Sequence, residues 1–165
     1  MPNLWLLNGG IVVALVLGTL IGGIAAYNGT PYTIDRANGF VDLAAATNNL
    51  TETVADLNQT LAILEPFHGN PNPVFATSHT DYDLVKKQIS TTIQAALAVL
   101  PLGPSSFAYQ QALKNIQSDL TTTVEGELHD ISGAILFWSF GIWAIIAWIV
   151  GVAVIVVASI VWGDF

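Results

Sequence analysis

The sequence predicts an all-α membrane protein in which two transmembrane helices flank a three-helix, coiled-coil-like extramembrane bundle. Residues 4–27 and 131–163 contain no charged side chain. Each stretch is longer than the roughly 20 helical residues that cross a bilayer core about 30 Å thick. The intervening residues, 28–130, carry every charged side chain except that of Asp164, and they have the size of one small domain.

Composition excludes several classes of protein. The chain is 53% hydrophobic and 10% charged, whereas ordinary soluble domains are about 25% charged. There are no cysteines, so disulfides and thiolate metal sites are excluded. The net charge is −8 with only four Lys and Arg residues, which makes nucleic acid an unexpected partner. No small-molecule substrate is evident, and the expected surroundings are the lipid bilayer and other membrane protein subunits or copies of this chain.

The two apolar segments are predicted to be transmembrane helices over residues 1–27 and 131–165. The first lacks the positive charge that precedes a signal peptide core, and its apolar stretch exceeds the usual core of about 7–15 residues. Gly29 and Pro31 end this helix and allow a new one to start. No proline lies between Ser105 and the second segment, so the second span should continue the preceding helix.

The bundle, residues 28–130, is expected to contain helices over about 33–65, 80–100 and 105–130. The first shows apolar or small residues at alternating spacings of three and four, the pattern of a coiled-coil seam. This seam consists of Phe40, Leu43, Thr47, Leu50, Val54, Leu57, Leu61 and Leu64. It ends at Pro66, where a connector rich in proline begins. Three helices would require this connector to return along the bundle as an extended strap.

Small residues in the spans predict where helices pack. Apolar side chains gain little by leaving lipid for one another, so helices associate where small residues allow close backbone approach. The simplest arrangement pairs the small faces within the hairpin. The predicted packing residues are Gly18, Gly22, Gly141, Ala144, Ala147 and Gly151. Trp143 and Trp148, expected on other faces of the second span, are predicted to contact a partner subunit.

Possible glycosylation sites favour one membrane orientation. Asn28, Asn49 and Asn58 each begin an Asn-X-Thr sequon. Sequons are used only on an extracytoplasmic domain, so the chain is interpreted as a two-pass glycoprotein. Its bundle would be extracytoplasmic and both termini cytoplasmic.

The polar residues form no catalytic signature, and no catalytic, cofactor or metal residue is predicted. His68, His79 and His129 share no ligand spacing, although a binding or redox module that uses them is one hypothesis. Glu125, Glu127 and Asp130 are expected to form a hydrated acidic collar above the second span. No ionisable side chain lies within either apolar segment, which argues against a proton relay or an ion path.

These observations favour a non-catalytic structural or accessory subunit that packs through its transmembrane hairpin in a larger assembly. One alternative is a self-assembling envelope or surface protein, possibly viral, that forms a lattice or spike. Another is a sensor-like ectodomain without its own signalling domain, because the arrangement loosely resembles the ligand-binding half of chemoreceptor-type sensors.

Overall fold

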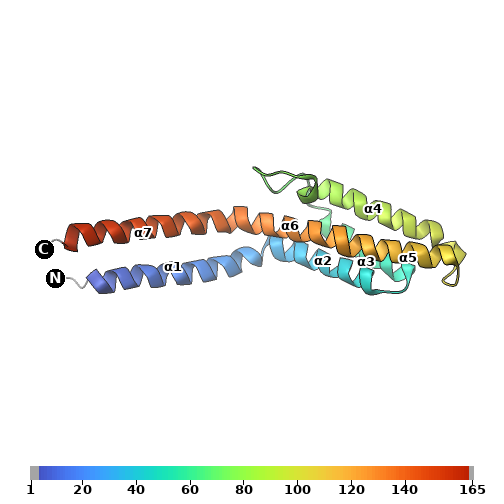
Figure 1. Cartoon of the computed structure of the whole chain (residues 1–165), viewed down its shortest axis with the longest axis horizontal. Helices are drawn as coiled ribbons and strands as arrows, with labels where there is room; N and C mark the ends of the chain where they lie inside the picture. The colour runs from blue at the N-terminus through green and yellow to red at the C-terminus, as the bar shows by residue number, and fades with distance from the viewer. Residues whose placement is uncertain (1–3, 164–165) are drawn as a thin grey trace. The chain divides into compact units, whose positions relative to one another are not determined.

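The computed structural model describes residues 4–163, which are almost entirely helical and contain no strand. The chain divides into two compact units. One unit, the bundle, comprises residues 30–135, and the other, the hairpin, comprises the segments before and after it. Figure 1 shows the helices of both units.

The bundle contains four helical segments within residues 30–135. They are α2 (Thr30–Ala46), α3 (Leu50–Leu64), α4 (Tyr82–Val99), and α5 (Phe107–Asp119) continued by the π-turn η3 (Leu120–Val124) and by α6 (Glu125–Leu136). Short 3₁₀ turns, η1 (Ser78–Thr80) and η2 (Leu100–Leu102), precede and follow α4.

Each helix of the bundle runs antiparallel to the one before it. Thr53 contacts Ala44 and Thr60 contacts Ala37, so α3 returns along α2. Phe67, just after α3, stacks on Tyr82 at the start of α4, with ring centroids 5.3 Å apart. The resulting up-down-up-down order is that of a four-helix bundle.

The prediction of one helix over residues 33–65 is wrong, because the chain reverses at Thr47–Asn49. Asn49 is the N-cap of α3, and its side-chain oxygen accepts a hydrogen bond of 2.9 Å from Thr51 N. The Thr47 hydroxyl accepts from Asn49 N at 3.3 Å and donates to Glu52 Oε2 at 2.6 Å. Short polar side chains that bond nearby backbone compete with helix in this way.

The additional helix also removes the need for an extended return strap. Residues 65–81 instead form a loop that connects the end of α3 to the start of α4. Gly69 O accepts a hydrogen bond from Tyr82 N at 2.9 Å, and Phe67 O accepts from Lys86 Nζ at 2.7 Å. The expected three-helix bundle is therefore a bundle of four helices.

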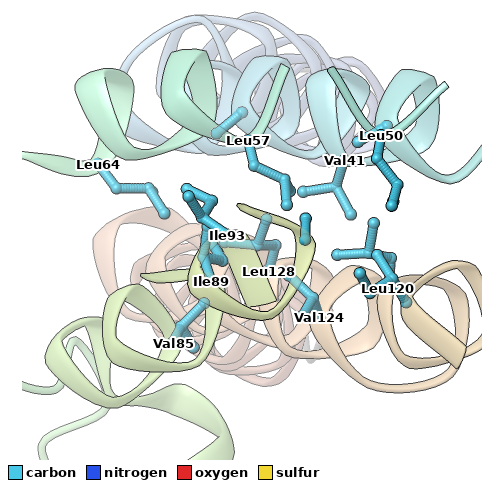
Figure 2. Packing of buried hydrophobic residues seen from close by; sticks show 14 of the residues in the cluster. Val41, Leu50, Leu57, Leu64, Val85, Ile89, Ile93, Leu120, Val124 and Leu128 are labelled. Atoms are coloured by element: carbon cyan, nitrogen blue, oxygen red, sulfur yellow. The ribbon is translucent and has the colours of Figure 1, made fainter. Parts of the chain in front are cut away.

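The core follows a different register from the predicted seam. Leu50, Leu57 and Leu64 are buried as expected, but Leu43 is 56% exposed. Thr53 and Thr60 occupy the core positions between the leucines, and both are fully buried. Figure 2 shows the three leucines of α3 pointing toward residues of α4, η3 and α6. These facing residues include Ile89, Ile93, Leu120, Val124 and Leu128.

The hairpin consists of α1 (Leu4–Tyr27) and of the π-turn η4 (Phe137–Gly141) followed by α7 (Ile142–Gly163). The two helices are antiparallel, because Asn8 contacts Ser159 while Thr19 contacts Trp148. Helical residues follow one another without a loop from Phe107 to Gly163. Within the described part of the chain, two helices are long and apolar enough to cross a membrane: Asn8–Tyr27 and Phe107–Val161.

We expect Leu57→Ala to destabilise the bundle by about 2–5 kcal/mol, the usual cost of truncating a buried leucine. Leu43→Ala is the matched control, since Leu43 belongs to the same predicted seam but is exposed, and it should cost less than about 0.5 kcal/mol. Denaturant unfolding of both variants measures the difference. Equal losses would contradict the observed register.

Candidate functional site

A polar contact lies inside the apolar hairpin. The indole Nε1 of Trp148 donates a hydrogen bond of 3.0 Å to Thr19 Oγ1, and the Thr19 hydroxyl donates to Leu15 O at 2.7 Å. A buried indole N–H is costly without a partner, so this contact selects the face of α7 that meets α1. The expectation that Trp148 points away from the hairpin is wrong.

Two of the predicted packing glycines receive large side chains rather than small ones. A Cβ added at Gly22 would lie 2.5 Å from Cε2 of Phe140. A Cβ added at Gly151 would collide with the Leu15 side chain. Each helix therefore places a bulky residue over a glycine of the other, which lets the backbones approach closely. Gly141 lies beside Phe137 of its own helix, with 3.2 Å from an added Cβ to Phe137 Cδ2.

The remaining predicted residues meet in a shallow hollow between the two helices, here called the α1–α7 groove. It has a volume of about 210 Å³ and is lined by Ala14, Leu15, Gly18, Thr19, Phe140, Trp143, Ala144 and Ala147. A Cβ added at Gly18 would have no neighbour within 4 Å. The groove thus brings Gly18, Ala144, Ala147 and Trp143 together between the two helices.

The groove lies in an otherwise apolar and exposed surface. Trp143 at its edge is 65% exposed, and large apolar side chains of both helices remain uncovered. Examples from α1 are Leu17, Leu20, Ile21 and Ile24, and examples from α7 are Ile149, Val157 and Ile160. Exposed apolar patches of this extent are rare on soluble monomers and are typical of surfaces that contact lipid or protein.

The sequon asparagines are all exposed. Asn28 lies in the turn between α1 and α2, and Asn49 caps α3. Asn58 lies within α3, where its Nδ2 donates to Val54 O at 2.8 Å.

The acidic collar is not uniformly hydrated, because Glu127 is only 8% exposed. Its Oε1 lies 3.1 Å from Nδ1 of His79, while its Oε2 is buried without a hydrogen-bond partner. Burial raises the pKa of Glu127, and the contact with His79 partly offsets this rise. The sequence contains a signal for this burial, since Glu127 follows Leu120 by seven residues and Val124 by three.

The other histidines lie elsewhere and do not converge with His79. His68 Nδ1 is 3.2 Å from Asp83 Oδ1, and Lys86 Nζ is 3.1 Å from the same oxygen. The Gly69 N–H also donates to Asp83, and together these groups lower the pKa of Asp83 to about 2. Among residues 4–163, no group of three or more His, Cys, Asp and Glu is arranged to hold a metal ion.

No family model matches the chain, and comparisons with curated proteins and with solved structures also find no match. The α1–α7 groove is the candidate site, because it gathers Gly18, Trp143, Ala144 and Ala147.

We expect Glu127→Gln to stabilise the bundle at neutral pH. A raised carboxyl pKa means that the fold favours the protonated form of Glu127. The stability that this protonated form contributes is fully present below the ordinary pKa of 4.5, and it is lost as the pH rises through the folded pKa. The gain of the glutamine variant over the native chain should therefore grow as the pH rises from 4.5 through the folded pKa of Glu127.

Unfolding curves across this pH range test the expectation. Glu125→Gln removes a negative charge two residues away and serves as the control. If the native chain instead gains stability relative to Glu127→Gln as the pH rises, the buried carboxylate of Glu127 does not destabilise the fold.

Proposed function

We propose that this chain is a two-span integral membrane protein that serves as a non-catalytic structural or accessory subunit of a larger membrane assembly. In this proposal α1 and α7 cross the bilayer and carry the helical bundle on one side. The α1–α7 groove receives a helix of a partner subunit.

The exposed surface of the hairpin supports the membrane crossing. Apolar side chains such as Ile21 and Ile149 are 68% and 64% exposed. Exposing them to water costs free energy, whereas exposing them to lipid does not. The backbone of both segments is helical throughout Leu4–Tyr27 and Phe137–Gly163, which satisfies its polar groups internally, as the bilayer core requires. The polar side chains of Trp148 and Thr19 bond to each other within the pair.

The groove is the observation that carries the subunit role. Small residues from both helices line it, and Gly18 has open space above it. Helices in lipid associate where small residues permit close approach. Trp143 at the edge would gain from protein contact, because aromatic side chains contribute large contact areas at interfaces. A third helix seated here would cover these residues together.

The proposed orientation places the bundle outside the cell and both termini in the cytoplasm. The exposure of Asn28, Asn49 and Asn58 supports this orientation, since an oligosaccharide needs an accessible asparagine.

Self-assembly is a second candidate, favoured by another hollow on α7. This hollow has a volume of about 530 Å³ and is lined by Ile149, Val150, Ala153, Val154, Val157, Ala158 and Val161. Two different contact surfaces on one hairpin would allow copies of the chain to join head to tail into rings or arrays. The stoichiometry of the native assembly distinguishes the candidates: unlike chains indicate a subunit, and many copies of this chain indicate a lattice.

We expect Gly18→Leu to release the partner while leaving the hairpin intact. The new side chain would fill the groove, and a Cβ at this position meets nothing within 4 Å. The native mass of the complex purified in mild detergent should fall, whereas the unfolding midpoint should change little.

Gly22→Leu is the matched variant, four residues along the same helix. It would collide with Phe140 and should destabilise the hairpin by about 1–3 kcal/mol, as overpacking generally does. An unchanged native mass in Gly18→Leu would reject the groove as the contact site.

A further inference from the structure

The loop between α3 and α4 presents an apolar tip. Val74 is 60% exposed and Phe75 is 70% exposed. Residues 66–80, here called the 66–80 loop, contain no Asp, Glu, Lys or Arg, although the chain as a whole carries a net charge of −8. A loop without Asp, Glu, Lys or Arg that exposes two adjacent apolar side chains is a candidate contact surface.

The tip is held by hydrogen bonds rather than by packing. Asn70 closes the base, since its Nδ2 donates to Thr77 O and to Thr80 Oγ1, both at 2.9 Å. Asn72 Oδ1 accepts from Phe75 N at 2.9 Å and from Val74 N at 3.3 Å. These bonds fix the backbone of the tip while leaving its two apolar side chains outside the core.

The loop lies at one particular end of the bundle. His79, near its last residue, contacts Glu127 of α6. At the same end, Ser132 Oγ lies 3.5 Å from Pro31 O, so the start of α2 and the end of α6 are neighbours. Figure 1 shows the loop extending beyond the first turn of α4, away from the opposite end of that helix. The bundle is joined to α1 and α7 at this end, through the turn at Asn28–Gly29 and directly after Ile135.

We infer that Val74 and Phe75 insert into the headgroup region of the bilayer and form a third attachment of the bundle to the membrane. The inference rests on the proposed function, because the chain connections place this end of the bundle next to the bilayer only if α1 and α7 cross it. Aromatic side chains favour the interface between headgroups and hydrocarbon. Because the loop contains no Asp, Glu, Lys or Arg, it avoids the desolvation cost that these residues would add there.

The absence of cysteine from the chain allows a direct test. A nitroxide label on Ala76→Cys, next to the tip, is compared with a label on Ala108→Cys in the full chain reconstituted in phosphatidylcholine vesicles. Both alanines are exposed and each follows an exposed phenylalanine, Phe75 or Phe107, the latter at the other end of the bundle. Collision with dissolved oxygen reports lipid, and collision with a water-soluble nickel chelate reports water.

We expect the label at position 76 to be accessible to oxygen and severalfold less accessible to the nickel chelate than the label at position 108. Phe75→Asp added to Ala76→Cys should restore access of the chelate without changing the unfolding midpoint. Equal access of the chelate at both positions would overturn the inference. Low access of both reagents at position 76 would mean that protein covers the tip, and would overturn it as well.

A label on Leu20→Cys, in the exposed face of α1, separates this inference from the proposed function. If that label is in lipid while the label at position 76 is in water, only the loop contact is rejected. If the label at position 20 is itself in water, the membrane crossing is rejected and the loop contact with it.

Discussion

The fold depends on a constraint of chain connectivity. In the hairpin, α1 and α7 run antiparallel, and Phe140 contacts Gly22 near the ends that lead to the bundle. The two segments that enter and leave the bundle must therefore emerge at one end, as the neighbouring Pro31 and Ser132 do. An even number of antiparallel helices meets this requirement without a long connection that runs back along the bundle. The reversal at Thr47–Asn49 supplies the fourth helix, and the turns on either side of α4 follow from it.

The sequence predicted the helical class and two apolar helices, but it could not predict the reversal. Asn48 and Asn49 are compatible with an exposed helical position. The break is favoured by local hydrogen bonds from Thr47 and Asn49, and by distant residues, since Leu50 N donates to Tyr109 Oη and Gln117 Nε2 donates to Thr47 O. The core register was ambiguous for a related reason. Thr53 and Thr60 are polar by type, yet their hydroxyls are each 3.3 Å from a carbonyl oxygen of α2. A hydroxyl bonded to backbone is buried at little cost, so polarity alone did not identify the inner face.

Helix rotation explains why Trp148, rather than Trp143, donates to a residue of α1. Trp143 and Trp148 are five residues apart, so they lie on different faces of a helix with 3.6 residues per turn. Only one of them can face α1, and the hydroxyl of Thr19 favours Trp148 because an indole N–H needs an acceptor. Once this rotation is set, Phe140 and Leu15 cover Gly22 and Gly151, while Gly18 stays open. The small residues could be identified from the sequence. Which side chains pack against them could not, because this follows from the rotation of α7 that accompanies the hydrogen bond between Trp148 and Thr19.

Glu127 shows how a locally unfavourable residue can position a distant segment. Its burial raises the pKa, and Oε2 has no hydrogen-bond partner, so the carboxylate weakens the core that surrounds it. In return, Oε1 binds His79 and ties the 66–80 loop to α6. Asp83 ties the other end of the same loop to α4 through Gly69 N. The two carboxylates hold the ends of the loop, and Asn70 and Asn72 hold its base and tip. The apolar side chains of Val74 and Phe75 take no part in this bonding and remain available for contact outside the bundle.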